Sequence, residues 1–232
     1  MAYRAIGFDL DNTLYHPDTK FLDALLPKLF GFWQEKHKIS SEEFHARDRV
    51  YKKIYGSGLK GFLVHTPELD LREFATLYRD EDYQQYLKPD EELQKILSEI
   101  DPHIKKYIVT NAPLIHTHKS LVALGVDHRV FDGIISLDTF GGKFCKPDIE
   151  VYQHMVQISG IPAHEWLFID DTLENLPPAQ QLGMRTVHIS PSPPVAHTGT
   201  AEKATYQFPR VHHIKKIHGL SGAWSLTTHH PV

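Results

Sequence analysis

Short runs of apolar and β-branched residues alternate along the chain with segments in which apolar residues recur every three or four positions. Runs of the first kind predict buried strands, and the longer periodic segments predict helices. Alternating strands and helices are typical of a parallel sheet with crossover helices, so the pattern predicts an α/β fold. The predicted strands are Ala5–Phe8, Tyr107–Val109, Gly133–Ser136, Leu167–Ile169 and Thr186–Ile189.

The helices expected after two of these strands have clear boundaries. One starts after Asn111, with Pro113 in its first turn, and stops at Gly125. Another covers Ile149–Ile158. Proline suits the first turn of a helix and glycine suits the position after its end. An additional short edge strand is expected at Ala204–Phe208.

Roughly a hundred residues separate the first two strands, whereas strand–helix connections usually take about 2–6 residues, so a folded insertion is expected. Helix starts are predicted at Asp70, at Pro89-Asp90-Glu91 and at Ser40, where Glu43 would complete a capping box. Residues 56–58 would end the helix from Ser40. The insertion also carries one helical apolar stripe. Its members are Phe21, Leu22, Leu25, Leu26, Leu29, Phe30 and Trp33.

Composition narrows the class of protein. The 232 residues are 41% apolar and 23% charged, which is ordinary for a packed globular domain. The formal net charge is −4 and the chain has no basic block, so we expect no nucleic-acid polymer as partner. The 17 histidines include the pair His116/His118, which lacks zincin spacing, and scattered surface histidines are favoured over a metal site.

The single cysteine, Cys145, cannot form an internal disulfide, and no run approaches the ~20 apolar residues of a membrane span. We therefore expect an unprocessed, soluble, cytoplasmic protein with no membrane partner. Cys145 lacks the histidine and asparagine pattern of a thiol nucleophile, so an inert packed thiol is favoured.

Acidic residues directly follow the first predicted strand. Asp9 and Asp11 are two residues apart, so both can face one side, in the crevice where parallel sheets bind ligands. Two acids held close need a proton or a cation, and Mg²⁺ prefers such oxygen ligands. The alternative is a solvated turn rich in Asp and Asn.

Three other segments carry related chemistry. Thr110 and Asn111 lie between a strand and a helix, where a phosphate can bind, although both types are also ordinary helix caps. Lys146 precedes a helix and can neutralise phosphate oxygens, although most lysines are solvated. Asp170 and Asp171 end another strand, so Asp170 can lie opposite the first acidic pair; the alternative is a helix cap.

The order of these motifs, Asp-x-Asp-x-Thr, then Thr-Asn, then Lys, then Asp-Asp, resembles the haloacid dehalogenase-like hydrolase superfamily from residue 8 to about 175. The strings FDLDNTLY, TNA, KPD and IDDTLEN resemble its pyrimidine 5′-nucleotidase branch. The resemblance implies a Rossmann-like parallel sheet core with an inserted α-helical cap. The expected divisions are core 1–15 and 88–210, cap 16–87, and a C-terminal segment 211–232 that is partly tail.

The resemblance also implies roles for matching residues. Asp9 would be the nucleophile that forms an aspartyl-phosphate, and Asp11 the general acid and base. Mg²⁺ would sit on the Asp9 carboxylate, the Asp11 backbone carbonyl and Asp170. The expected phosphate-binding residues are Thr110, Asn111 and Lys146, and the expected supporting residues are Thr13, Asp171 and Asn175.

The implied substrate is a small phosphomonoester, with nucleoside 5′-monophosphates first and phosphoglycolate or sugar phosphates as alternatives. A phosphomutase would keep the same residues. The presence of Asp11 argues against a dehalogenase, and the position of the Asp-Asp pair late in the chain argues against a signalling receiver. An inactive phosphate-binding module is the non-enzyme alternative. The oligomeric state is left open. Aromatic residues near the cap are candidate contacts to the leaving group, although such residues more often pack in a core: Tyr15, His16, Trp33, Tyr51, Tyr55 and Phe62.

Overall fold

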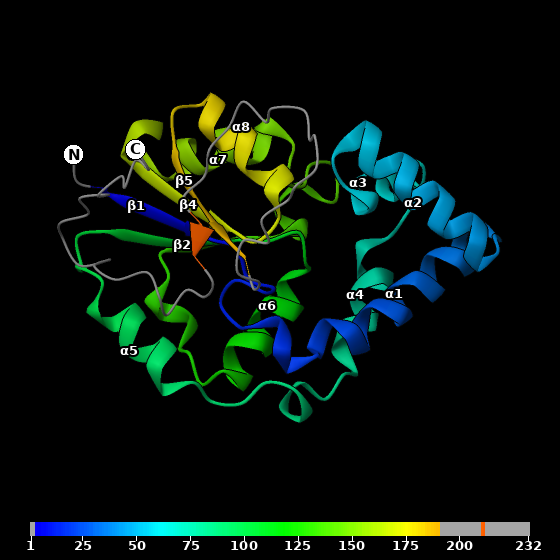
Figure 1. Cartoon of the computed structure of the whole chain (residues 1–232), viewed down its shortest axis with the longest axis horizontal. Coiled ribbons are helices and arrows are strands. Elements are labelled where there is room, and N and C mark those ends of the chain that lie inside the picture. The colour runs from blue at the N-terminus through cyan, green and yellow to red at the C-terminus, as the bar shows by residue number, and fades with distance from the viewer. Residues whose placement is uncertain (1–2, 191–209, 212–232) are drawn as a thin grey trace, which may run out of the picture.

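A computed structural model describes residues 3–190 and 210–211 of the chain. Its centre is a six-stranded parallel sheet in the order β3-β2-β1-β4-β5-β6, which confirms the α/β prediction (Figure 1). The strands are β1 (Ala5–Phe8), β2 (Lys105–Val109), β3 (Gly133–Ile135), β4 (Trp166–Asp170), β5 (Arg185–Ile189) and β6 (Arg210–Val211).

The helices are α1 (Phe21–His37), α2 (Ser41–Tyr55), α3 (Gly58–Val64), α4 (Leu71–Arg79), α5 (Glu91–Glu99), α6 (Leu114–Ala123), α7 (Ile149–Ser159) and α8 (Leu176–Gln181). Six helices, α1, α2 and α4–α7, lie where the sequence predicted them, whereas α3 and α8 were not among the predicted helices. The segment expected at Ala204–Phe208 and the chain after residue 211 lie outside the described residues.

The sheet is buried on both faces, which explains why its strands are continuous apolar runs. Alternate residues of each strand enter different cores. Ile6 and Phe8 pack in one core with apolar side chains of α5 and α6, whereas Ala5 packs in another with those of α7 and α8. Together these two cores hold the carboxyl ends of β1, β2 and β4 at one edge of the sheet.

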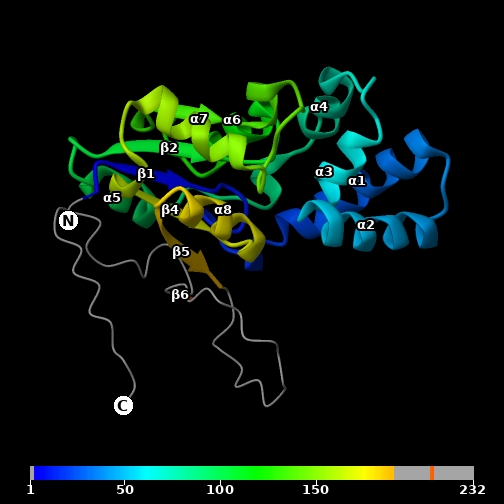
Figure 2. The same cartoon turned by 90° about the horizontal axis from the view of Figure 1, so that it is seen from above.

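Helices α1–α4 lie between β1 and β2, in residues 16–87, a segment that we call the insertion; β1 points toward them in both views (Figures 1 and 2). The insertion has its own apolar core, built around Trp33, Phe44, Phe62 and Phe74. Leu137 and Cys145, which follow β3, join that core, so the insertion packs against the loops at the end of the sheet.

Two predicted helix starts are confirmed in detail, because the side chains of Asp70 and Asp90 accept from the amides of Arg72 and Leu93 at 2.9 and 3.0 Å. The capping box at Ser40 is formed only in part. Ser40 Oγ accepts from the Glu43 amide at 3.2 Å, but the Glu43 carboxylate pairs with a neighbouring arginine one turn away, as an i, i+4 ion pair.

Candidate active site

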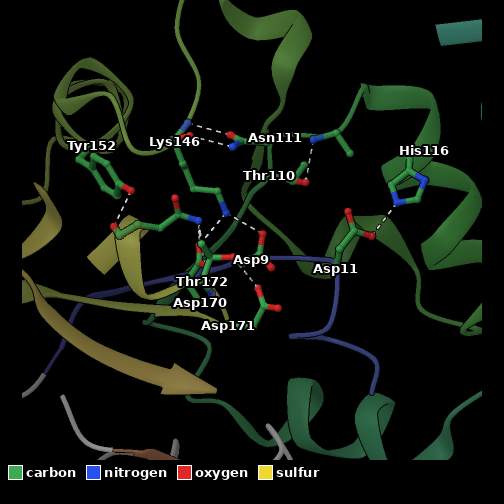
Figure 3. A network of polar contacts seen from close by, with 12 residues as sticks. Asp9, Asp11, Thr110, Asn111, His116, Lys146, Tyr152, Asp170, Asp171 and Thr172 are labelled. Atoms are coloured by element: carbon green, nitrogen blue, oxygen red, sulfur yellow. Dashed lines mark hydrogen bonds and ion pairs between the residues drawn. The ribbon is translucent and has the colours of Figure 1, made fainter. Parts of the chain in front are cut away.

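The polar residues that end neighbouring strands meet at the carboxyl edge of the sheet. Asp9 follows β1, and its amide donates to Ile169 of β4 at 2.8 Å; Thr110 follows β2, and Asp170 is the last residue of β4. The regular parallel register therefore places these three side chains in one cluster (Figure 3).

Lys146 lies at the centre of this cluster. Its Nζ donates to Asp9 Oδ1 at 2.6 Å and to Asp170 Oδ2 at 2.7 Å, and the side chain is only 2% exposed. Burial acts to lower the pKa of Lys146, but the Asp170 and Asp9 carboxylates outweigh that effect and hold the pKa above its ordinary value. The lysine therefore stays protonated between the two acids at neutral pH.

The backbone of Lys146 is held by Asn111. The side-chain oxygen of Asn111 accepts from the Lys146 amide at 2.7 Å, and its Nδ2 donates to the Lys146 carbonyl at 2.8 Å. Both polar atoms of the amide are used in this clamp. In the structure the Asn111 side chain positions the loop that carries the lysine, and its expected contact with the phosphate stays a prediction.

Asp170 is oriented from the other side. Asn175 Nδ2 donates to its two carboxylate oxygens at 2.9 and 3.0 Å, and the Thr172 amide donates to Oδ1 at 2.8 Å. The Asn175 carbonyl in turn accepts from the Tyr152 hydroxyl at 2.6 Å. These bonds fix the carboxylate of a fully buried residue.

Asp9, Asp170 and Asp171 form a cluster of acids with the composition of a cation site. One oxygen from each lies within 4.8 Å of the others. Burial raises the pKa of Asp9 well above its ordinary value, and burial with the nearby Asp170 raises the pKa of Asp171 to about 7. When ionised, the three acids carry more negative charge than Lys146 neutralises, and a cluster made only of oxygen donors fits Mg²⁺. The cluster adds Asp171 to the ligands expected from the sequence.

The Asp11 carboxylate points away from Lys146 and toward α6 (Figure 3). Its Oδ1 lies 2.7 Å from His116 Nε2 and accepts from the Tyr15 hydroxyl at 2.5 Å. Burial acts to raise the pKa of Asp11, but the charge and hydrogen bond of His116 and the hydrogen bond of Tyr15 outweigh it, so the pKa lies below its ordinary value. This orientation leaves the Asp11 side chain out of the cation cluster.

The sequence missed the role of His116, which it grouped with His118 among surface histidines. The structure corrects this, because His116 is fully buried and its Nδ1 lies 2.8 Å from the Tyr83 hydroxyl. The usable signal was its position in the first turn of the helix after Thr110, a turn that lies at the same sheet edge. Tyr15 was expected only as a cap aromatic and instead contacts Asp11.

The other expected residues also lie near this edge or are buried beside it. Thr110 Oγ1 accepts from the Ala112 amide at 3.1 Å, which leaves its hydroxyl proton free to donate. Thr13 is buried, and its hydroxyl has no hydrogen-bond partner within the described part of the chain. Cys145 is buried, and burial raises the pKa of its thiol to about 12, as expected for an inert cysteine.

A family model for haloacid dehalogenase-like hydrolases matches residues 3–183, a span that contains every residue of the site. The chain belongs to this family. The order of motifs noted in the sequence is therefore confirmed as a family relationship, although the match does not distinguish the pyrimidine 5′-nucleotidase branch.

Two curated relatives share moderate identity with this chain. Phosphate metabolism protein 8 of Saccharomyces cerevisiae is 28% identical over 201 residues, which cover 81% of this chain and 62% of the relative. Sesquiterpene phosphatase astK of Aspergillus oryzae is 34% identical over 107 residues, which cover 46% of this chain and 53% of the relative. The chain thus spans less than two thirds of either relative.

Solved structures share the fold of this chain at low identity. The magnesium-bound HAD-hydrolase YfnB from Bacillus subtilis has a TM-score of 0.52 at 19% identity, covering 93% of this chain and 96% of its own. CbbY from Rhodobacter sphaeroides, in complex with phosphate, has a TM-score of 0.54 at 18% identity, and the match covers 81% of this chain and 86% of CbbY. Both agree with the Rossmann-like α/β core. Within the described residues, no helix has the length and apolar character needed to cross a membrane.

Proposed function

We propose that this protein is a magnesium-dependent phosphomonoester hydrolase that acts through an aspartyl-phosphate on Asp9. The observation that carries the proposal is the buried Lys146 ammonium between Asp9 and Asp170, with Asp171 beside them. Family membership supports it, as do the phosphatase name of one relative and the phosphate and magnesium bound in the two structural neighbours.

In the first step an Asp9 carboxylate oxygen attacks phosphorus, and the bond from phosphorus to the leaving oxygen breaks. Asp11 donates a proton to that oxygen, and later accepts one from the water that attacks the aspartyl-phosphate, which breaks the bond from the Asp9 oxygen to phosphorus and releases inorganic phosphate. The low pKa of Asp11 applies to the free site. An arriving phosphate dianion adds negative charge nearby and raises that pKa, which favours the protonated acid that the step requires.

Phosphate oxygens would be held by donors from two loops. Lys146 offers its ammonium, and Thr110 offers its hydroxyl proton. Asn111 contributes by clamping the backbone of Lys146, and Asn175 by orienting Asp170. Thr13 stays a supporting residue in this proposal.

The residues that would hold Mg²⁺ are Asp9 and Asp170 through carboxylates and Asp11 through its backbone carbonyl, with Asp171 alongside. When bound, the ion supplies positive charge that offsets the repulsion between the acids and the phosphate. The fit rests on the surplus of acids over Lys146 in a buried cluster made only of oxygen donors.

The sequence resemblance makes nucleoside 5′-monophosphates the first substrate class, with phosphoglycolate, sugar phosphates and a phosphomutase outcome as alternatives. We take the insertion (residues 16–87) as the cap that covers the leaving group. Lys60 of α3 supports this, since its Nζ lies 2.5 Å from Asp148 Oδ2, next to the Lys146 loop. Cytoplasmic location stays a prediction.

The test is phosphate release from p-nitrophenyl phosphate, UMP, CMP and simple alkyl phosphates, with and without Mg²⁺. Release that requires both Mg²⁺ and Asp9, as shown by Asp9→Asn, is expected. Asp18→Asn is the matched control, because its side chain is 85% exposed and lies outside the cluster. Equal rates in wild type and Asp9→Asn would overturn the proposal. Phosphate transfer to a sugar hydroxyl without release would indicate a mutase.

A further inference from the structure

A cavity of about 500 Å³ connects the candidate active site to the interior of the insertion. At one end it is lined by Asp11, Asn111 and Asn175, and its other walls come mainly from α1–α4. Its volume lies within the roughly 300–1,000 Å³ of typical small-molecule sites. Any leaving group released beside Asp11 can therefore extend into this space.

The walls within the insertion are mostly apolar, and several of their rings contact one another. Trp33 stacks on Phe62 with centroids 5.3 Å apart, and Phe62 stacks on Phe44 at 4.9 Å. Leu25 and Leu29 of α1 also line the space. These rings pack against one another, so the cavity is built before a ligand arrives.

The polar side chains along the insertion part of the cavity are already paired. Lys52 Nζ lies 2.7 Å from Asp48 Oδ2, and Ser57 Oγ accepts from the Lys60 amide. At the other end, Asn111 uses both amide atoms on the backbone of Lys146, and the remaining polar wall comes from Asp11, Thr172, Glu174 and Asn175. A ribose or a nucleobase in the insertion part would face mostly apolar side chains and leave hydroxyls or base edges poorly hydrogen-bonded, which opposes binding there.

We infer that the leaving group is an extended apolar alcohol, so that the preferred substrates are monophosphate esters of long aliphatic alcohols. This inference rests on the proposed function, because it assigns the cavity beside Asp11 to the leaving group. It differs from the nucleotide expectation drawn from sequence resemblance. The phosphate remains at Lys146 while the hydrocarbon lies against Leu29 and the ring cluster of Trp33, Phe44 and Phe62.

The activity test uses ethyl, butyl, hexyl and octyl monophosphates below micellar concentrations, with UMP and CMP in parallel. Each methylene that enters the cavity should raise kcat/KM by up to about fourfold until the space is filled. The nucleotides should rank below octyl phosphate. UMP or CMP above octyl phosphate, or a flat series, would overturn the inference and leave the hydrolase proposal intact.

A substitution within the cavity tests where the chain binds. Leu29→Trp should reduce the ratio of octyl to ethyl kcat/KM, because the larger ring occupies the space for the chain. Ile54→Trp is the matched control: Ile54 is 64% exposed on α2 and does not line the cavity, so the ratio should match wild type. An unchanged ratio in folded Leu29→Trp would place the chain elsewhere.

A binding measurement separates this inference from the hydrolase proposal. Calorimetry with alkylphosphonates, which cannot be hydrolysed, should show affinity that increases from ethyl to octyl in the wild-type chain and less so in Leu29→Trp. Such binding without hydrolysis of any ester would refute the hydrolase proposal alone. Affinity independent of chain length would refute the apolar leaving-group site.

Discussion

His116 Nε2 lies 2.7 Å from Asp11 Oδ1, and the whole imidazole is buried. The imidazole is stacked on Phe21 at 5.7 Å between centroids, and its other nitrogen lies 2.8 Å from the Tyr83 hydroxyl. Because Phe21 and Tyr83 belong to the insertion, the proposed acid on the β1 loop is oriented by α6 and the insertion together.

Replacing His116 should weaken proton donation more than phosphate binding. His116→Ala frees the Asp11 carboxyl to rotate, and we expect kcat to fall about tenfold to a hundredfold on an alkyl phosphate. The loss should be smaller on p-nitrophenyl phosphate, whose leaving group needs little protonation. Steady-state kinetics on both esters give the comparison.

His118→Ala is the matched control for that experiment, because His118 is an exposed residue on the same helix. It should leave both rates near those of wild type. His116→Gln, which keeps a donor near Asp11, should recover part of the loss. Equal losses on both esters would show that His116 stabilises the fold without acting on Asp11.

Removing Lys146 should destabilise the protein as well as inactivate it. Lys146→Met leaves the buried Asp9 and Asp170 carboxylates without their cation, and losing one partner of a buried ion pair typically costs about 3–5 kcal/mol. Urea unfolding at pH 7 measures the change. Lys143→Met, at an exposed lysine, should change stability little. Similar stability of the two variants would contradict the role assigned to Lys146.

Magnesium should stabilise the folded chain because its proposed ligands converge only after folding. At a free concentration one hundred times Kd, the gain is about 2.7 kcal/mol, seen as a rise in Tm. Asp170→Asn should reduce that rise sharply, whereas Asp18→Asn should retain it. A rise of the same size in Asp170→Asn would place the ion elsewhere.

Asp132 should contribute stability that depends on pH. Burial acts to raise the pKa of Asp132, but the hydrogen bonds from Lys105 Nζ at 2.8 Å and the Lys106 amide at 2.9 Å hold it below the ordinary 3.8. A carboxyl group whose pKa is lower in the folded state stabilises the fold at pH values above its unfolded-state pKa. That stabilisation is lost as the pH falls through the folded-state pKa.

The corresponding experiment compares Asp132→Asn with wild type by urea unfolding from pH 7 down to pH 2. The variant should be less stable at pH 7 by up to about 1 kcal/mol, since the pair is partly exposed, and the difference should shrink at the acid end. Asp138→Asn is no suitable control because Asp138 accepts from the Leu114 amide; Asp18→Asn serves instead. If the stability difference between Asp132→Asn and wild type stayed constant with pH, the ionised Asp132 carboxylate would not be its source.

The sequence by itself determined the sheet and the meeting of its polar ends. Continuous apolar runs are local signals, and parallel strands bring their carboxyl ends to one edge, so Asp9, Thr110 and Asp170 were predictable as neighbours. Helix starts at Asp70 and Asp90 were predictable for a similar reason, because a cap bonds within three residues.

Partners distant in the chain were decided only by tertiary structure. Neither the burial of His116 against Asp11, 105 residues away, nor the bond of Asn111 to the Lys146 backbone follows from local pattern. The apolar stripe of α1 predicted burial, but whether Leu29 fills a core or lines a cavity depends on how α1–α4 pack together. Side-chain periodicity identifies which face is apolar, and only the packed neighbours determine what that face contacts.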